Sequence, residues 1–553
     1  MQKHKGIIIL LLALILVNAG QCFSTELLND EAYYWLWSRF PAWGYFDHPP
    51  MVALFIKAGY ALFKNELGVR LLFILTNAAT VYLLYHIVKP ARQGLFILVL
   101  LSVTPLMAAG YFAVPDIAVL FFAACFFLAY RTYLDADTIP NALLLGVCMA
   151  LMLYSKYHGV LTIFFVLLSN LQLLKRKTFY LACVAGALFF APHMWWQWQN
   201  DFPTFRFHLF ERSREAYSWL RTAEYIGGQL VLAGIPAGLL LLYSTVRYKA
   251  KNKFQRALQF QLWGTYIFFL VSSFKGRTEA NWTIINTIPL VILSYRFLEA
   301  NDKPARWLKF MLPISLLSIM AIRVHYGTDL TRRYLGVPSE TQHWKAWADT
   351  IANHAGNRTV VFLSSYQRAS KYAFYSGNSS FTTTEVGMRK SQFNIWPVED
   401  EIQNKEIYVC TYFSYWPARA KAHDEIRTTL TDCEGFVVDS FMSWCKAKVT
   451  VPGQPYTATR GQVIAIPIKV QLPYSNHPSP NSGSRISYRI YRGKTKLGDY
   501  ETGVLLSDVM DGAIHDINVT VPDTTGQYQV FVSVKQDDFP PPINSAGVNV
   551  NVK

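Results

Sequence analysis

The feature that most constrains the fold of this chain is a series of apolar runs, each about long enough to cross a bilayer. A spanning helix needs about 20 mostly apolar residues. Only 16% of the 553 residues are charged and the mean hydropathy is +0.18, whereas soluble globular proteins carry about 25% charged residues. The sequence therefore predicts a polytopic α-helical membrane protein. About eleven spans are expected, at residues 6–23, 67–88, 94–110, 114–132, 139–155, 159–174, 179–198, 225–246, 257–273, 281–298 and 306–323.

The basic residues indicate which way these helices face. The net charge is +16, and many of the Lys and Arg residues lie in short clusters in alternate loops between the apolar runs. Cytoplasmic loops of membrane proteins collect Lys and Arg, so this pattern argues against nucleic-acid binding and predicts a cytoplasmic N-terminus with an uncleaved first span. The clusters are Lys89–Arg92, Arg131, Lys175–Lys177, Arg247–Lys253 and Arg296–Lys309. The chain after residue 324 is then expected on the outer side, in the periplasm if the membrane is a bacterial inner membrane.

The composition changes after the last apolar run, which predicts three domains. Residues 1–324 form the membrane domain, and 325–446 alternate between helical and strand-like patterns, as in an α/β domain. Short alternating runs separated by Gly, Pro, Asn and Asp fill 447–553 and predict a β-sandwich of about 100 residues. No CxxC pair indicates a zinc site, and Cys433 and Cys445 are candidates for one disulfide.

The predicted topology brings the unusual polar residues of the membrane domain to its outer side, which suggests a single outward-facing site. The first outer loop is the most informative, because Asp30 and Glu31 open a run of interfacial aromatic residues. The sequence YFDHPP at 45–50 then precedes a short apolar run, 51–63, that is expected to lie along the membrane surface. The other residues of this set are Asp47, His48, Asp116, Lys156, His158, Lys275, Arg277 and Glu279.

Five short motifs in this domain resemble those of the family-39-type glycosyltransferases. They are DEAYYW at 30–35, YFDHPP at 45–50, VPD at 114–116, SKYHG at 155–159 and KGRTEANW at 275–282. These multispanning enzymes of the GT-C class use polyprenyl-phosphate sugars, and they include protein O-mannosyltransferases and the aminoarabinose transferase that acts on lipid A. The resemblance extends from about residue 24 to 300. It implies a transfer from undecaprenyl or dolichyl phosphate to an acceptor on the outer side.

The resemblance also implies roles for the acidic residues. Asp30 matches the family's general base, a group that typically contributes 10²–10⁴-fold to a rate, and direct attack by the acceptor would invert the anomeric carbon. Glu31 is expected to orient the acceptor or a metal, and Asp116 matches a second outer-loop acid. The sequence leaves metal dependence open, because these three carboxylates could share a divalent cation or act without one.

The leaving lipid phosphate needs cations, and stabilisation of such developing charge is often the largest contribution to catalysis. Lys156 is the strongest candidate, followed by Arg70, His48 and Lys275. Tyr157 beside Lys156 and Glu279 near Lys275 complete the expected substrate-binding set, although Glu279 and Lys275 also fit a local ion pair. The lipid A branch of the family has Lys where this chain has His48, and that departure weakens the prediction of lipid A as the acceptor.

Two other classes of protein remain as alternatives. A transporter or lipid flippase would place its ionisable residues near the bilayer midplane in repeated halves, and neither feature is present. A surface protein anchored by its spans would need only one of them. The sugar, and whether the acceptor is a protein, lipid A or another glycan, are not determined by the sequence.

Overall fold

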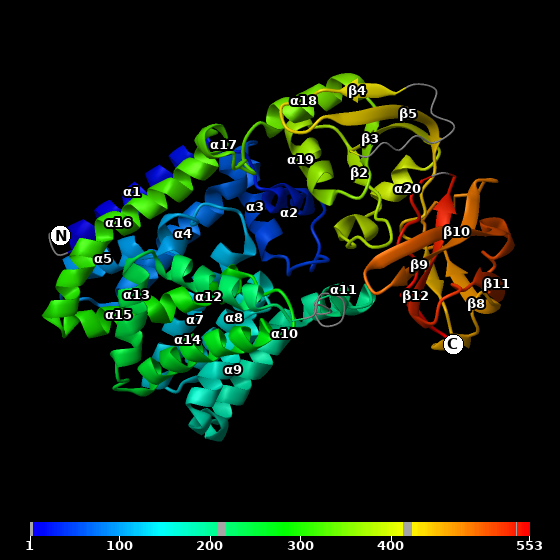
Figure 1. Cartoon of the computed structure of the whole chain (residues 1–553). Coiled ribbons are helices and arrows are strands. Elements are labelled where there is room, and N and C mark those ends of the chain that lie inside the picture. Colours follow the sequence, from blue (N-terminus) through cyan, green and yellow to red (C-terminus); the bar gives the residue numbers. More distant parts are fainter. Residues whose placement is uncertain (1–3, 208–216, 413–422, 477, 538) are drawn as a thin grey trace. The chain divides into compact units, whose positions relative to one another are not determined.

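The computed structural model describes residues 4–207, 217–412, 423–476, 478–537 and 539–553. The chain divides into two compact units, Met1–Gln342 and His343–Lys553. The first is helical and the second is rich in strands, as the cartoon shows (Figure 1). Each unit is described separately below.

The helical unit contains most of the apolar runs as helices. Its longer helices are α1 (Lys5–Gln21), α2 (Asn29–Arg39), α3 (Met51–Leu62), α4 (Glu66–Val88), α5 (Gln93–Ser102), α7 (Pro115–Asp135), α8 (Ile139–Ser155), α9 (Gly159–Ser169), α10 (Lys177–Gln199), α12 (Trp219–Ala233), α13 (Ala237–Arg247), α14 (Lys253–Ser272), α15 (Thr287–Glu299) and α16 (Asp302–Gly327). The shorter ones are α6 (Thr104–Met107), α11 (Pro203–Arg206), α17 (Leu330–Leu335) and the 3₁₀ helices η2 (Leu171–Lys175) and η4 (Ala280–Asn286).

Four of these helices are long and apolar enough to cross a membrane, namely α4, α7, α10 and α16, when the described residues are searched. The helices α12 and α13 together make a fifth candidate, but they meet at an angle of 94°. Other predicted spans are interrupted; for example, the run 94–110 is divided into α5 and α6, and Pro105 lies at the start of α6. A membrane-spanning architecture is therefore confirmed, whereas the number of eleven spans is not.

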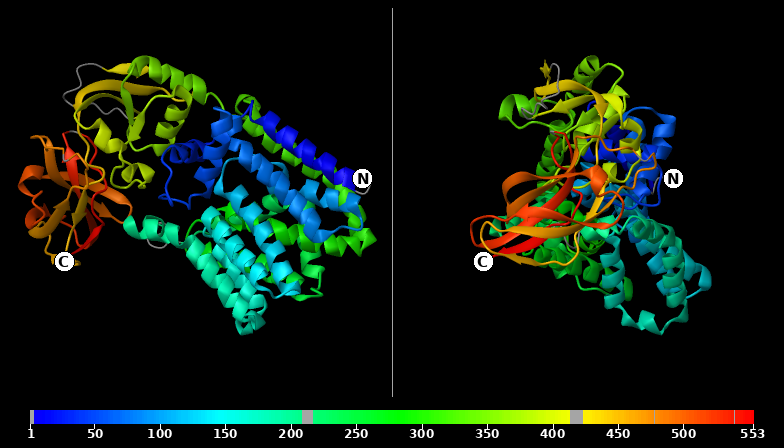
Figure 2. Two further views of the ribbon diagram at one scale, coloured as in Figure 1. Left: turned by 180° about the vertical axis from the view of Figure 1, so that it is seen from behind. Right: turned by 90° about the vertical axis from the view of Figure 1, so that its right-hand side faces the viewer.

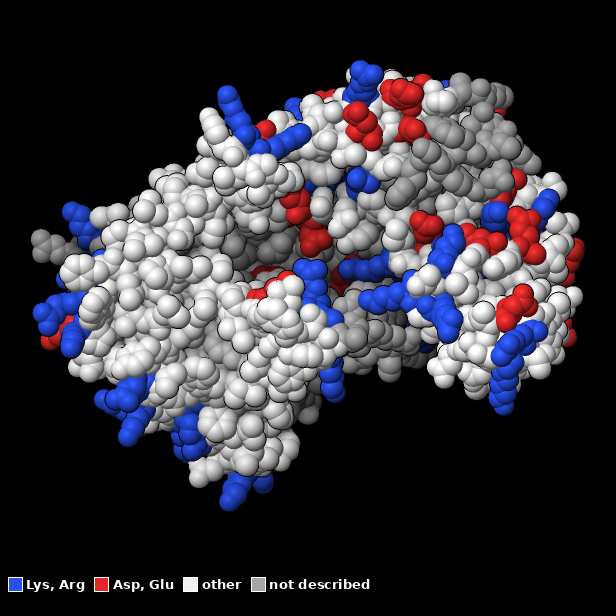
Figure 3. All heavy atoms as spheres, viewed as in Figure 1, with Lys and Arg blue, Asp and Glu red and all other residues white. Residues whose placement is uncertain are grey.

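The surface of the helical unit exposes many apolar side chains, as contact with lipid requires. Large apolar side chains are exposed on several helices, including Leu16 on α1, Leu188 on α10 and Phe310 on α16, each about 70% exposed or more. The visible face of this unit is largely uncharged in Figure 3. The helices α1 and α16 are far apart in the sequence but run side by side (Figures 1 and 2), and Arg323 Nη2 of α16 donates a hydrogen bond to Asn18 Oδ1 of α1 at 2.5 Å.

The predicted surface run 51–63 forms α3, which packs closely against α4. A Cβ atom added to Gly59 of α3 would lie 2.3 Å from the carbonyl oxygen of Gly68 in α4, so only glycine permits this approach. The α3 residues Met51, Val52 and Ile56 are buried. This pairing fixes the end of α4 that carries Arg70 next to the first predicted outer loop.

The second unit begins with a five-stranded sheet in the order β2-β1-β3-β5-β4. Strand β1 (Thr359–Phe362) is parallel to β2 (Ser380–Thr382) and β3 (Lys405–Thr411), whereas β5 (Cys433–Phe441) is antiparallel to β3 and to β4 (Asp424–Ile426). The helices of this part are α18 (Trp344–Ala355), α19 (Tyr366–Ser376), α20 (Val398–Ile402) and the 3₁₀ helix η5 (Gln392–Asn394). In this register Cys433 lies diagonally across from Cys410 on the neighbouring strand. Cys445, the predicted disulfide partner of Cys433, is buried just after the end of β5. All seven cysteines are free thiols.

Two further sheets follow, in the orders β10-β9-β12-β13-β7 and β11-β8-β6. Alternate residues from both sheets, among them Ile466, Ile490 and Val532, are buried in one apolar cluster, as expected when two sheets pack face to face. The strands are β6 (Lys448–Thr450), β7 (Tyr456–Ala458), β8 (Val463–Gln471), β9 (Ser484–Arg492), β10 (Thr495–Leu505), β11 (Ile514–Thr520), β12 (Gly526–Gln536) and β13 (Val548–Val552), with the 3₁₀ helix η6 (Leu506–Asp508) after β10.

Candidate active site

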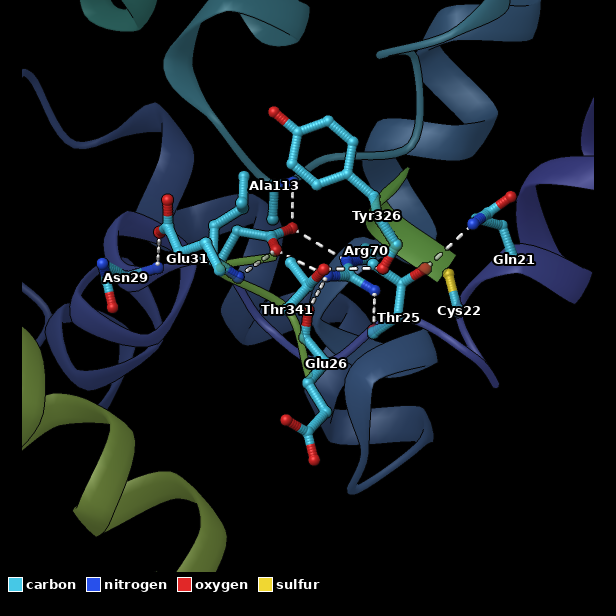
Figure 4. A network of polar contacts seen from close by, with 12 residues as sticks. Gln21, Cys22, Thr25, Glu26, Asn29, Glu31, Arg70, Ala113, Tyr326 and Thr341 are labelled. Carbon is cyan, nitrogen blue, oxygen red and sulfur yellow. Dashed lines mark hydrogen bonds and ion pairs between the residues drawn. The ribbon is translucent and has the colours of Figure 1, made fainter. Parts of the chain in front are cut away.

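The two acidic residues at the start of α2 have opposite environments. Asp30 is exposed, whereas Glu31 is completely buried and forms an ion pair with Arg70, which is equally buried. Arg70 Nε lies 2.8 Å from Glu31 Oε1, and Arg70 Nη2 lies 2.6 Å from Oε2. This two-point contact is the strongest geometry available to an arginine and a carboxylate, and it is drawn in Figure 4.

Backbone groups take up most of the remaining bonding capacity of the Glu31–Arg70 pair. The amide of Leu28 donates to Glu31 Oε2 at 2.9 Å, and the amide of Ala113 donates to Oε1 at 2.7 Å. Arg70 donates to the carbonyl oxygens of Thr25 and Glu26 at 2.6 and 2.9 Å. Glu31 and Arg70 therefore connect α2, α4 and the segment before α7, and neither is exposed to a substrate.

The first predicted outer loop is also held by residues from the end of this unit. Glu340 Oε1 accepts a hydrogen bond from the Asn29 amide at 2.5 Å, and the Thr341 carbonyl oxygen accepts one from the Glu26 amide at 3.1 Å. The Gln342 side chain donates to the Ser24 carbonyl oxygen at 3.0 Å. These contacts fix the backbone on which Asp30 stands.

A second charged cluster brings three of the five motifs together around Asp116. Lys156 Nζ lies 2.8 Å from Asp116 Oδ1, and Asn281 Nδ2 lies 3.2 Å from the same oxygen. Asp116 and Lys156 are 6% and 3% exposed, so this ion pair is almost entirely removed from water. The motifs VPD, SKYHG and KGRTEANW thus converge on one carboxylate. The segment with Asp116 is joined to α2 as well, because Glu31 binds Ala113 three residues earlier.

The remaining motif, YFDHPP, is positioned by a network around Tyr157. The Tyr157 hydroxyl lies 2.5 Å from His193 Nε2, and Gln197 Nε2 donates to it at 2.9 Å. Gln197 also donates to Thr204, whose hydroxyl donates to the Phe46 carbonyl oxygen at 2.8 Å. Burial raises the pKa of Tyr157, so the hydroxyl stays protonated at neutral pH.

The backbone just before YFDHPP is held against α10. His193 Nδ1 is 2.7 Å from the Trp43 carbonyl oxygen, and a Cβ atom added to Gly44 would lie 2.5 Å from the Trp196 ring. The Tyr45 ring stacks on Trp37 of α2, with the ring centroids 4.5 Å apart. All five motifs are therefore linked by direct contacts or through one or two intervening side chains.

Three of the predicted substrate-binding residues are less buried than Lys156 and Arg70. His48 is partly exposed, with its ring 5.9 Å from that of Tyr34. Lys275 is exposed, and Glu279 forms an ion pair with Arg277 at 3.1 Å, not with Lys275 as the sequence suggested. Arg70, predicted to bind the lipid phosphate, is instead enclosed by Glu31 and backbone carbonyls.

The three candidate metal ligands do not fit a shared cation. Among the described residues, no three His, Cys, Asp or Glu side chains are grouped as a metal site requires. Glu31 is bound to Arg70, Asp116 is bound to Lys156, and Asp30 is exposed. The arrangement is that of two ion pairs beside an exposed carboxylate.

Several residues of these networks carry little or no signal in the sequence. Asn281 lies within the motif KGRTEANW, but the local pattern marks it only as part of a glycosylation sequon. A usable signal exists for His193 and Gln197, because residues four apart share one face of a helix. Thr204 and Glu340 carry no such signal, since only the folded chain brings them to the site.

Solved structures with the same fold exist. The chain matches ArnT from Cupriavidus metallidurans bound to undecaprenyl phosphate, with a TM-score of 0.57 and 13% sequence identity, covering 78% of this chain and 98% of that one. The apo structure of the same protein matches with a TM-score of 0.57 and 14% identity, covering 79% and 98%. At this level of identity the likeness establishes the fold.

The family model described as dolichyl-phosphate-mannose-protein mannosyltransferase matches residues 47–196. That range contains Arg70, Asp116, Lys156 and Tyr157, so it covers much of both networks. The fold and this match together identify the chain as a membrane glycosyltransferase of the GT-C class.

One curated relative is the lipid A galacturonosyltransferase RgtD of Rhizobium johnstonii (strain DSM 114642 / LMG 32736 / 3841). It is 24% identical to this chain over 363 residues, which cover 61% of this chain and 75% of that protein.

Proposed function

We propose that this protein is an inverting glycosyltransferase that moves a sugar from a polyprenyl phosphate to a hydroxyl or phosphate group on the outer side of a bacterial inner membrane. The observation that carries the proposal is the difference in exposure between Asp30 and Glu31. Both lie in the first turn of α2, but only Asp30 is exposed. A general base must reach the proton that it removes, and among these two acids Asp30 alone meets that requirement.

Glu31 and Arg70 act in this proposal as positioning residues. They fix the start of α2 to α4 and to the segment before α7 through four hydrogen bonds to the Glu31 carboxylate. The position of Asp30 relative to the Asp116 region is thereby held. This assignment replaces the expected roles of Glu31 as an acceptor-binding acid and of Arg70 as a phosphate ligand.

Lys156 supplies the positive charge for the leaving phosphate. Its ammonium group has three N–H donors, and the described contacts place one of them on Asp116. Asp116, held in turn by Asn281, orients the ammonium group. A cation that is held in place and shielded from water stabilises developing negative charge far better than a solvated one. Lys275 and His48 are exposed enough to guide the lipid phosphate toward this position.

The donor and acceptor are inferred from the relatives. ArnT from Cupriavidus metallidurans has been solved bound to undecaprenyl phosphate, which supports a polyprenyl-phosphate donor. The Rhizobium protein is named for its action on lipid A, which favours a lipid acceptor for this chain over a protein. The helical domain, residues 1–324, carries the catalysis in this proposal. Residues 325–446 and the β-sandwich 447–553 are accessory domains that engage the acceptor or the cell envelope.

The test uses purified full-length protein in nanodiscs with radiolabelled polyprenyl-phosphate sugars and lipid A as the acceptor. Transfer of label to the acceptor, with the anomeric configuration of the product inverted, is the expected result. Asp30→Asn should lower the rate of this transfer by about 10²–10⁴-fold. The matched control is Asp302→Asn, because Asp302 is 78% exposed and lies at the start of α16. Retention of configuration, or no transfer from any donor by folded protein, would contradict the proposal.

A further inference from the structure

A cavity of about 380 Å³ lies in the helical unit, away from Asp30 and Asp116. Three cationic side chains line it, from Arg131, Lys253 and Arg296, together with the single carboxylate of Asp135. Its inner wall is apolar and includes Ile87 and Ile292, which are 2% and 3% exposed. The cavity therefore combines an excess of positive charge with an apolar surface.

The direction of the helices places this cavity at the opposite end of the unit from the proposed transfer site. Arg70 lies near the start of α4 and Ile87 near its end, a separation of about 26 Å at 1.5 Å per residue. Likewise, Asp116 lies near the start of α7 and Arg131 near its end. This distance approaches the thickness of the hydrocarbon core, about 30 Å. The cavity thus opens near the other membrane surface, the one that the positive-inside pattern assigns to the cytoplasm.

The two arginines are held in place but retain bonding capacity. Arg131 Nη1 donates to the Ile87 carbonyl oxygen at 2.7 Å, the one hydrogen bond that this side chain makes within the described part of the chain. Arg296 donates to the Val88 carbonyl oxygen and to Glu299 Oε2, the latter at 3.0 Å. A guanidinium group has five N–H donors in a planar fork that matches phosphate oxygens. Both guanidinium groups are therefore held at the end of α4 and have N–H donors left for a ligand.

The backbone adds to the positive potential of the cavity. Helix α14 begins there, with Asn252 as its N-cap and the Gln255 amide bound to the cap oxygen at 2.9 Å. The amide groups in the first turn of a helix carry a partial positive charge. Asp135 is the one acidic side chain in the lining, so the lining groups favour an anion.

We propose that this cavity binds the phosphate group of an anionic lipid on the side of the membrane opposite to the transfer site. A phosphate fits the arginine pair and the start of α14, and an acyl chain fits the apolar wall. Basic pockets between membrane helices are a recurrent means of holding anionic head groups. Such a lipid would join the ends of α4, α7, α14 and α15. The far ends of α4 and α7 carry Arg70 and Asp116, and a ligand that binds only the folded state stabilises that arrangement.

The experiment measures lipid binding to the purified full-length protein in a neutral detergent. Intrinsic tryptophan fluorescence reports the melting temperature during titration with phosphatidic acid, phosphatidylcholine or inorganic phosphate, and native mass spectrometry counts the bound lipids. The test variant is Arg131→Gln with Lys253→Gln. Arg306→Gln is the matched control, because Arg306 is an exposed arginine near the start of α16 that does not line the cavity.

Phosphatidic acid should raise the melting temperature of the wild type and of Arg306→Gln and remain bound in the mass spectra, and phosphatidylcholine should do neither. The double variant should bind phosphatidic acid at least tenfold more weakly. An equal response of the double variant, or an equal response to phosphatidylcholine, would overturn the proposal. A response to inorganic phosphate that matches the lipid response would overturn the lipid as the occupant.

Discussion

Replacing Glu31 by Gln should destabilise the folded protein strongly, because it leaves the buried, charged guanidinium group of Arg70 without a carboxylate. Breaking a buried pair by removing one partner costs about 3–5 kcal/mol. Glu31 and Arg70 are both 0% exposed, and the Glu31 carboxylate accepts four hydrogen bonds. We therefore expect a loss toward the upper part of that range, against total stabilities of about 5–15 kcal/mol.

The same pair offers a double-mutant cycle. Arg70→Gln alone should also cost about 3–5 kcal/mol, whereas the double variant should cost less than the sum of the two by at least about 1.5 kcal/mol, within the range for residues in contact. The control cycle uses Arg92 and Asp302, which form an ion pair of 2.7 Å but are 46% and 78% exposed. An exposed pair of this kind contributes about 0–1 kcal/mol.

The assay is equilibrium unfolding in mixed detergent micelles, followed by tryptophan fluorescence, together with the transfer rate per folded molecule. Glu31→Gln should lower stability, and the protein that remains folded should lose some transfer activity through displacement of Asp30 but keep more of it than Asp30→Asn does. A cost below about 1 kcal/mol, equal to that of the exposed pair, would refute the reasoning about burial. A stable Glu31→Gln variant as inactive as Asp30→Asn would show that Glu31 takes part in the chemistry.

Three more results are expected. Lys156→Met should lower the transfer rate by about 10²-fold or more, since it removes the preorganised charge opposite the leaving phosphate; unchanged single-turnover rates would exclude that role. Tyr157→Phe removes the hydroxyl that His193 and Gln197 bind and should cost about 1–3 kcal/mol of stability, measured as a lower unfolding midpoint. Burial raises the pKa of Glu399 above its unfolded value of about 4.3. Protonation of Glu399 therefore favours the folded state, and this contribution is lost as the pH rises through the raised pKa. Unfolding measured from about pH 4 to pH 8 should show the loss, and Glu399→Gln should remove it.

The helical architecture and the outer-side grouping of motifs could be predicted because both depend on local composition. Apolar length marks a spanning segment, and clusters of Lys and Arg mark its orientation. A count of apolar residues does not predict where a spanning segment is interrupted. The predicted span 225–246 is divided at Gly234–Pro236, and those residues were a readable signal, since proline removes a helix hydrogen bond.

The family resemblance predicted Asp30 as the base, but the role of Glu31 as a buried partner of Arg70 could not be predicted from the sequence. Asp30 and Glu31 are adjacent, equally charged and equally close to the first span, so local patterns do not distinguish them. The difference arises because Arg70, 39 residues away in the chain, faces Glu31 and not Asp30 in the folded protein. Asp116 and Asn281 are separated by 165 residues, and their contact likewise depends on how the helices pack.

The measurement that tests the account most directly is the single-turnover rate of sugar transfer by Asp30→Asn and by Asp302→Asn, at equal amounts of folded protein. The account predicts a loss of about 10²–10⁴-fold for Asp30→Asn, the usual contribution of a general base, and a rate within about twofold of the wild type for Asp302→Asn, whose exposed carboxylate has no part in the proposed mechanism. A rate for Asp30→Asn within about tenfold of the wild type would contradict the central claim that this exposed carboxylate activates the acceptor.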